Sequence, residues 1–131
     1  MTRVDIERAV RDAAATAPEE VLSVYLYGSH ARGEATPRSD VDVGVLFRES
    51  PPRTLGGVAS GLEGLIEREV GVPVEVVVMN TASSDLVHRI LRDGVLLLDR
   101  DRSARLRFEV QSRNEYFDLA PLRRLYRRLP A

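Results

Sequence analysis

The segment VDVGVLF at residues 41–47 constrains the fold more than any other part of the chain. Strict alternation of this kind is typical of a half-buried β-strand, because successive side chains point to opposite faces of a sheet. The two faces are Val41, Val43, Val45 and Phe47 on one side, and Asp42, Gly44 and Leu46 on the other. A chain with such a strand must bury its apolar side against a second layer of secondary structure.

The other apolar patterns alternate between strands and helices along the chain. Further strands are expected at residues 21–27, 73–79 and 95–98. Helices are expected at residues 4–17, 55–70, 85–92, 103–118 and after Pro121, with one helical turn at 30–33 and a turn at 50–53. Strands interleaved with helices predict a single domain over residues 1–131, a two-layer α/β architecture in which helices cover one face of the sheet.

Some helix ends and helix faces are also predicted. Thr2 and Asp5 form the pattern of a capping box before the first helix. Ser84 is the expected cap of the helix at 85–92. Three residues of the helix at 103–118 are expected to point inward: Leu106, Val110 and Phe117.

All 19 basic residues are arginine, and they are distributed unevenly. Residues 100–131 form a helical, Arg-rich segment with nine arginines and four acidic residues, a net charge of +5, whereas residues 1–99 carry −6. This segment either engages an acidic protein surface, engages nucleic acid, or is a solvated helix face. Its last helix has one apolar face, which either packs on the domain's own sheet or docks a partner. That face consists of Leu122, Leu125, Tyr126 and Leu129.

Several classes of site are excluded by composition. The chain has no cysteine, which excludes thiolate zinc sites, iron–sulfur clusters and cysteine nucleophiles. No apolar run approaches about 18 residues, so we expect no membrane span. The N-terminal residues lack the apolar core of a signal peptide, and we therefore expect a cytoplasmic protein.

Two acidic residues stand two positions apart at the start of the strand at 41–47. Asp40 and Asp42 therefore point to the same side of the strand. Neighbouring carboxylates repel one another, and a divalent cation neutralises them best. Gly44 follows on the same face and leaves room above the sheet for a substrate. These residues predict a divalent-cation site beside an open surface of the sheet.

A third acid, Glu75, lies in the middle of the strand expected at 73–79. A carboxylate at such a position is costly to bury unless a cation or hydrogen bonds stabilise it. If this strand neighbours 41–47, Glu75 converges with Asp40 and Asp42 on a site for one or two metal ions. A site of this kind supports in-line displacement at phosphorus.

The turn Gly28-Ser29, directly after the strand at 21–27, predicts an anion site. Glycine lets the backbone approach a ligand closely, and free N–H groups with a serine hydroxyl would hold phosphate oxygens. The turn is neither a Walker loop nor a dinucleotide fingerprint, because GK[ST] and GxGxxG are both absent.

The sequence leaves more than one role open for some of the side chains around this turn. His30 either contacts a phosphate or lies at the surface, and Arg32 either reaches a phosphate or braces the loop at 33–39. Arg38 is expected to contact a nucleotide. Two further residues are expected to have structural roles only, Tyr27 and His88.

Together these residues resemble the motif of the nucleotidyltransferase superfamily that includes DNA polymerase β. The motif is GS, ten residues, then DxD, here Gly28-Ser29 and Asp40-Val41-Asp42. Its longer form, GSxARGxxxxxSDxDxxV, matches through five further residues: Ala31, Arg32, Gly33, Ser39 and Val45. The resemblance covers about residues 20–98. The small size of the chain and its C-terminal YFDLAPLRRLYRRL are similar to minimal nucleotidyltransferase (MNT) antitoxins encoded beside HEPN-domain toxins.

The resemblance implies the nucleotidyltransferase fold, a mixed β-sheet with helices packed on one face. It implies that Asp40 and Asp42 bind two Mg²⁺ ions and that Gly28 and Ser29 hold the β- and γ-phosphates of the nucleotide. We also expect the nucleotide to contact Arg32, Arg38 and Ser39. It places Glu75 where the family usually has an aspartate that binds metal and helps to deprotonate the attacking hydroxyl. Glutamate is one methylene longer, so either the site has adjusted or catalysis is weak.

On this resemblance we expect a Mg²⁺-dependent enzyme that transfers AMP from ATP to a hydroxyl, with a tyrosine of a partner HEPN toxin as acceptor. Two alternatives are a catalytically weak antitoxin that neutralises its partner by binding, and a small-molecule nucleotidyltransferase of the aminoglycoside-modifying type that needs a helical partner chain. We expect neither nucleic acid nor a membrane as a partner. Self-association is left open.

Overall fold

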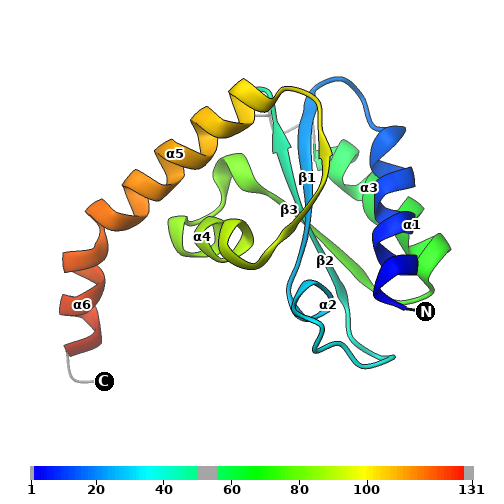
Figure 1. Cartoon of the computed structure of the whole chain (residues 1–131), viewed down its shortest axis with the longest axis horizontal. Coiled ribbons are helices and arrows are strands. Elements are labelled where there is room, and N and C mark those ends of the chain that lie inside the picture. Colours follow the sequence, from blue (N-terminus) through cyan, green and yellow to red (C-terminus); the bar gives the residue numbers. More distant parts are fainter. Residues whose placement is uncertain (1, 50–55, 129–131) are drawn as a thin grey trace.

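A computed structural model describes residues 2–49 and 56–128, and Figure 1 shows how their elements are arranged. The strands are β1 (Val21–Tyr27), β2 (Val41–Phe47), β3 (Val74–Val78) and β4 (Val95–Asp99). The helices are α1 (Arg3–Ala15), α2 (Ser29–Arg32), α3 (Gly56–Val70), the 3₁₀ turn η2 (Met79–Thr81), α4 (Ser84–Asp93), α5 (Arg102–Asp118) and α6 (Ala120–Arg128). The predicted turn at 50–53, together with Leu55 and Leu129, lies outside the described residues.

The four strands form one mixed sheet in the order β3-β2-β1-β4. β1 is antiparallel to both β2 and β4, whereas β2 and β3 are parallel. The parallel pair is connected through α3, the kind of crossover that parallel strands require. The strand register brings the end of β1 and the beginnings of β2 and β3 together at one end of the sheet.

One face of the sheet is covered by α1 and α3 (Figure 1). The predicted alternation in β2 is confirmed, because Val41, Val43 and Val45 are fully buried on this face. They pack into a cluster with apolar side chains of the two helices: Ile6, Val10, Ala13, Leu62 and Ile66. At about 25 cal/mol per Å² of apolar area removed from water, this cluster is the main stabilising layer of the domain.

The opposite face of the sheet is covered by α4 and the beginning of α5. The α/β class and the mixed sheet are confirmed, but the helices are not confined to one face. The reason lies in the strands, whose second face is also apolar and would otherwise be exposed to water. The buried side chains of this second cluster are Leu22, Tyr25, Leu46, Met79, Val87 and Ile90.

A polar network fixes the start of α5 to the sheet. The hydroxyl of Tyr25 donates to Glu109 Oε1 at 2.7 Å. Arg105 donates to Asp99 at 2.8 Å and to Glu109 at 2.9 Å, and its side chain is largely buried. Two of these partners belong to strands β1 and β4, so the first turns of α5 are held rigidly.

Farther along, α5 leaves the body of the domain and leads into α6 (Figure 1). The prediction that Leu106, Val110 and Phe117 point inward is wrong, since their exposed fractions are 39%, 51% and 58%. The side of α5 that faces the domain instead carries Ala104, Phe108 and Ser112. No residue of α6 is buried, so its apolar face does not pack on the sheet.

Helix ends follow the sequence closely. The capping box at the start of α1 is confirmed, with the Asp5 backbone N–H donating to Thr2 Oγ1 and the Thr2 N–H donating to the Asp5 carboxylate. The cap of α4 is Ser83 rather than Ser84, because it is the Ser83 hydroxyl that accepts from the Leu86 N–H. None of the helices in residues 2–49 and 56–128 combines the length and apolarity needed to cross a bilayer.

Candidate functional site

The acidic residues of β2 and β3 meet at the end of the sheet where β1 stops. Asp42 is the register partner of Tyr27 on β1 and of Glu75 on β3. Asp42 and Glu75 line a cavity of about 580 Å³, and the Gly28-Ser29 turn lines it too. Two of the three predicted carboxylates therefore share one cavity with the predicted anion-binding turn.

Gly28 brings the turn into direct contact with the carboxylate of Asp42. Its φ of +75° is a conformation that side-chain-bearing residues rarely adopt. A Cβ at this position would lie 2.2 Å from Asp42 Oδ2, far inside van der Waals contact. Glycine is thus required both for the backbone angle and for the space that the carboxylate occupies.

Carboxylates dominate the electrostatics around Asp42 and Tyr27. Burial raises the pKa of the Asp42 carboxyl, and the charges of Glu75 and Asp40 raise it further, although His30 and Arg32 oppose the shift. Burial, followed by the charges of Asp42 and Glu75, raises the pKa of Tyr27 to about 12. A bound cation would relieve this repulsion, so the arrangement favours a divalent ion at Asp42 and Glu75.

The predicted cage of three carboxylates is only partly assembled. Asp40 is exposed and lies outside the cavity lining, and Glu75 is exposed rather than buried because β3 is an edge strand. Across the described part of the chain, no group of three or more acidic or histidine side chains is close enough to hold a metal. Two carboxylate ligands nevertheless fit Mg²⁺, which commonly takes one or two carboxylates and completes its shell with water and substrate phosphates.

The space predicted above Gly44 is filled by other side chains. A Cβ on Gly44 would lie 3.1 Å from the sulfur of Met79 and 3.3 Å from Cδ1 of Ile90. The cavity therefore lies at the end of the sheet beside Asp42 and does not extend over Gly44. Gly44 serves close packing of α4 on the sheet instead.

The basic rim of the cavity comes from α2 and α4. Arg32, predicted beside the nucleotide, lines the cavity and donates to Glu34 at 3.1 Å. Arg92 also lines it and is paired with Asp93 at 2.8 Å. Arg89 completes the rim. The two arginines of α4 were not identified from the sequence, although their spacing of three residues places them on one side of a helix.

Tyr27 also lines the cavity, which adds to the core-packing role expected of it. Its hydroxyl stays protonated at neutral pH, because its pKa is raised to about 12. It can therefore donate a hydrogen bond to a ligand but cannot accept a proton from one.

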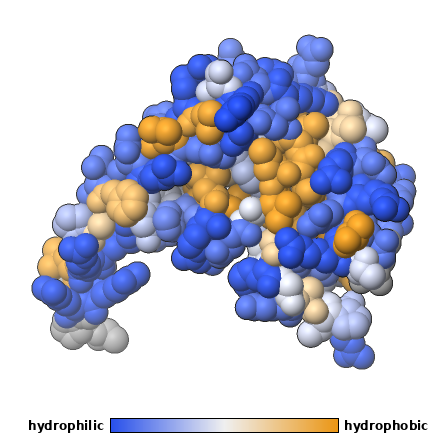
Figure 2. All heavy atoms as spheres, in the orientation of Figure 1, coloured by the Kyte–Doolittle hydropathy of each residue, from blue (hydrophilic) through white to orange (hydrophobic). Residues whose placement is uncertain are grey.

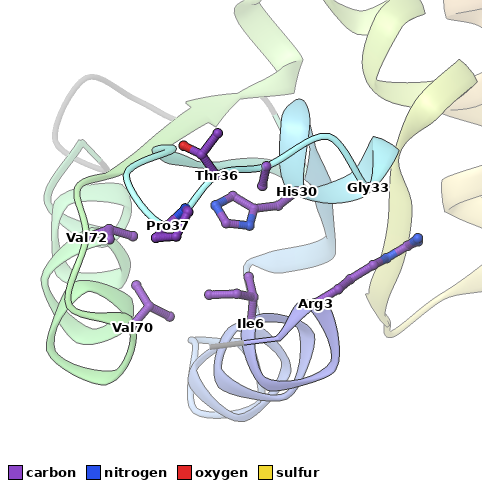
Figure 3. Close-up of a pocket in the computed structure, with 9 residues that line it drawn as sticks. Arg3, Ile6, His30, Gly33, Thr36, Pro37, Val70 and Val72 are labelled. Carbon is purple, nitrogen blue, oxygen red and sulfur yellow. The ribbon is translucent and has the colours of Figure 1, made fainter.

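The residues of the 33–39 loop that are predicted to bind the nucleotide do not line the cavity that contains Asp42 and Glu75. The Ser39 hydroxyl accepts from the Thr36 N–H at 2.9 Å and so stabilises its own loop. Arg38 is exposed and lies outside the cavity lining. His30 contacts the Ser39 carbonyl oxygen through Nε2 at 3.1 Å and lines a second cavity of about 380 Å³, with its ring directed toward Ile6 and Pro37 (Figure 3).

The chain is similar to known proteins in both sequence and fold. A family profile described as polymerase β nucleotidyltransferase matches residues 11–103. No curated protein sequence matches the chain significantly. A solved minimal nucleotidyltransferase shares 28% identity at a TM-score of 0.58, over 72% of this chain and 95% of that one.

Two toxin–antitoxin complexes contain chains of the same fold. One, bound to AMP-PNP, matches at 21% identity and a TM-score of 0.77, over 92% of this chain and 94% of that chain. The other is the complex of a tri-AMPylated HEPN toxin with its MNT antitoxin from Shewanella oneidensis, at 18% identity and a TM-score of 0.72, over 95% of each chain. The profile match spans most of the chain and includes the GS turn and both aspartates of the DxD motif, and the chain therefore belongs to the polymerase β nucleotidyltransferase family.

Proposed function

We propose that this chain transfers AMP from ATP to a hydroxyl in a Mg²⁺-dependent reaction, and that the acceptor is a tyrosine of a partner HEPN toxin. The observation that carries the proposal is the register pairing of Asp42 with Glu75 beside the Gly28-Ser29 turn. Carboxylates next to a phosphate-binding turn are what a nucleotidyltransferase needs, since its substrate brings both a polyphosphate and the metal that accompanies it.

In this proposal the nucleotide's phosphates lie against the turn and the basic rim. The backbone N–H groups after Gly28 and the Ser29 hydroxyl would donate to phosphate oxygens, and no Cβ at position 28 blocks the approach. Arg32 and Arg89 would bind the departing pyrophosphate from the two sides of the cavity. Each of these contacts strengthens as negative charge builds on the leaving group.

The carboxylates have two tasks. Asp42 and Glu75, with Asp40 nearby, would hold Mg²⁺, which when bound offsets the negative charge that develops on the transferring phosphoryl group. Glu75 would also accept the proton of the attacking hydroxyl, because it lines the cavity and is exposed, so that an acceptor can reach it.

The proposed reaction is an in-line displacement at the α-phosphorus of ATP. The hydroxyl oxygen of the acceptor attacks the α-phosphorus, a new O–P bond forms, and the bond between that phosphorus and the bridging oxygen to the β-phosphate breaks. Pyrophosphate leaves, and the proton passes through Glu75 to water. Positioning and charge stabilisation supply nearly all of the rate in such transfers.

The choice of acceptor is supported by the fold relatives. One is the antitoxin-containing complex of an AMPylated HEPN toxin, and another contains AMP-PNP. ATP as the donor is consistent with a cytoplasmic protein.

A second candidate function is neutralisation of the toxin by binding alone. The exposed apolar side chains of α5 and α6 favour it, because they provide a contact surface that needs no catalysis. The glutamate at position 75, in place of the aspartate usual in the family, is the feature that would weaken the chemistry.

The test is incubation with Mg²⁺, ATP labelled in its α-phosphate, and a HEPN-domain toxin. Label that appears on a toxin tyrosine with the wild-type chain, and not with Asp42→Asn, supports AMP transfer. Toxin inhibition that survives Asp42→Asn and needs no nucleotide supports neutralisation by binding. Label found only on a small hydroxylated compound such as an aminoglycoside contradicts both.

A further inference from the structure

Exposed apolar side chains are concentrated on one part of the molecule. We call α5 and α6 together, Arg102–Arg128, the arm. Of the eight large apolar residues that are exposed in the described chain, the arm carries all but Val4. Figure 2 shows apolar side chains along the arm, separated by hydrophilic ones, where it extends away from the body. The seven exposed apolar residues of the arm are Leu106, Val110, Phe117, Leu119, Leu122, Leu125 and Tyr126.

These side chains do not serve the chain's own core. Leu122, Leu125 and Tyr126 have exposed fractions of 47%, 56% and 66%, and α6 buries no residue. An open groove of about 800 Å³ runs along α5 beside Leu106 and Val110. A concentration of exposed apolar side chains on this scale, with polar residues between and around them, is typical of a protein interaction site.

Despite its exposure, the arm is held at a defined place by a stack of three side chains. The rings of His88 on α4 and Tyr116 on α5 are parallel, with centroids 3.7 Å apart. The guanidinium of Arg123 on α6 lies 3.7 Å from the Tyr116 ring centroid and 3.6 Å from the carboxylate of Asp85. Arg123 also donates to the Tyr116 carbonyl oxygen. The sequence predicts a structural role for His88, and in the structure this role is to hold the arm against α4.

The stack relates the arm to the candidate active site. α4 contributes Asp85 and His88 to the arm contact and contributes Leu86, Arg89 and Arg92 to the cavity lining. The helix α4 therefore contacts the arm and also borders the cavity. A protein held by the arm would be positioned against the same helix that borders the cavity.

The charge of the arm indicates the kind of partner. Eight arginines and three acidic residues lie in Arg102–Arg128. Arg105 and Arg123 are paired within the chain, which leaves exposed arginines such as Arg124 and Arg127 beside the apolar side chains. Two copies of the arm would bring like charges together, so self-association through the arm is disfavoured.

We propose that the arm is the docking surface for the protein acceptor, and that the partner's contact surface is apolar and bordered by carboxylates. This inference rests on the proposed function, which takes the HEPN toxin as that acceptor. The apolar side chains supply affinity, the surrounding arginines supply orientation and association rate, and the stack on α4 sets the distance to the cavity.

The experiment measures binding of a HEPN-domain toxin to the full chain by calorimetry. Leu122→Asp combined with Leu125→Asp should weaken binding at least about tenfold, as truncation of central apolar contacts does. The matched control is Val4→Asp on α1, an equally exposed apolar residue outside the arm, which should leave binding unchanged. Arg124→Glu with Arg127→Glu should weaken binding and reduce its salt dependence, whereas Arg11→Glu on α1 should not.

Three results would overturn the docking proposal. Arm variants could bind the HEPN protein as tightly as wild type, the Val4 control could lose as much affinity as they do, or the arm variants could abolish self-association of the chain and leave toxin binding intact. Far-ultraviolet circular dichroism checks that each variant is folded. AMP transfer is assayed separately. If binding depends on the arm but no AMP is transferred, the proposed function is contradicted and the docking surface is not. If arm variants bind with unchanged affinity and still transfer AMP, the docking surface is contradicted and the proposed function is not.

Discussion

Asp42 and Glu75 are direct neighbours across the parallel ladder of β2 and β3. Burial and the charges of Glu75 and Asp40 raise the pKa of the Asp42 carboxyl, so the ionised form is disfavoured in the folded chain. The contribution of the neutral Asp42 carboxyl to the free energy of unfolding is fully present below an aspartate's ordinary pKa of 3.8. It is lost as the pH rises through the raised pKa of Asp42 in the folded chain. This pair therefore reduces stability at neutral pH in the absence of a cation.

Asp42→Asn should raise the melting temperature at pH 7, because it removes the disfavoured charge. The gain should shrink as the pH is lowered toward 4, where the wild-type carboxyl also becomes neutral. Thermal denaturation from pH 4 to 8 measures both. Asp12→Asn on the exposed side of α1 is the control, and an equal gain there would contradict the explanation. Nucleotide transfer by Asp42→Asn should fall by at least about 100-fold.

Mg²⁺ should stabilise the wild-type chain by occupying the site formed by Asp42 and Glu75. At a concentration ten times the dissociation constant, the expected stabilisation is about 1.4 kcal/mol, measurable as a rise in melting temperature. Glu75→Gln should reduce this rise, and Glu63→Gln on α3 should not. An identical Mg²⁺ response in wild type and Glu75→Gln would show that the ion does not bind at this carboxylate.

Gly28 and Gly33 offer a matched pair, since both have φ near +70°. Alanine at either position carries the cost of a left-handed backbone, about 1–2 kcal/mol. Only at Gly28 would the new Cβ also collide with the Asp42 carboxylate, as nothing lies within 4 Å at Gly33. Gly28→Ala should therefore lose both stability and nucleotide transfer, whereas Gly33→Ala should lose stability alone. Chemical denaturation and the transfer assay distinguish the two.

Arg89→Ala should raise the KM for ATP by about tenfold or more, the usual cost of removing a charged hydrogen bond to phosphate. Arg68→Ala, on α3 at the other face of the sheet, should leave the KM unchanged. Partial recovery by Arg89→Lys would indicate that charge rather than the planar guanidinium is needed. A normal KM for Arg89→Ala would exclude this residue from nucleotide binding.

The strands were predictable because their signals are local. The residues 21–27 and 41–47 alternate or carry β-branched and aromatic residues, and both strands begin and end as expected. The GS turn and the aspartates were predictable for a similar reason, since a glycine, a serine and carboxylates at fixed spacing have few other uses together. Arg89 was missed because nothing in its own segment shows that α4 lies across the ends of β1 and β2.

The apolar residues of α5 show where sequence patterns are ambiguous. Leu106 and Val110 have the spacing of a helix face, and that spacing is the same whether the face packs on a core or on another protein. Gly44 is a comparable case, because a missing side chain leaves space that either a ligand or a neighbouring helix can fill. In both cases the tertiary arrangement decides, and the sequence pattern does not contain it.

The position of β4 at the edge of the sheet has a consequence for synthesis. β1 is a central strand, and its second partner is the last strand along the chain. On the ribosome, a nascent chain that ends before residues 95–99 would carry β1 with one edge unpaired, which is a hazard for aggregation. Since the arm follows β4 directly, the sheet can close before the arm, our proposed docking surface, has emerged.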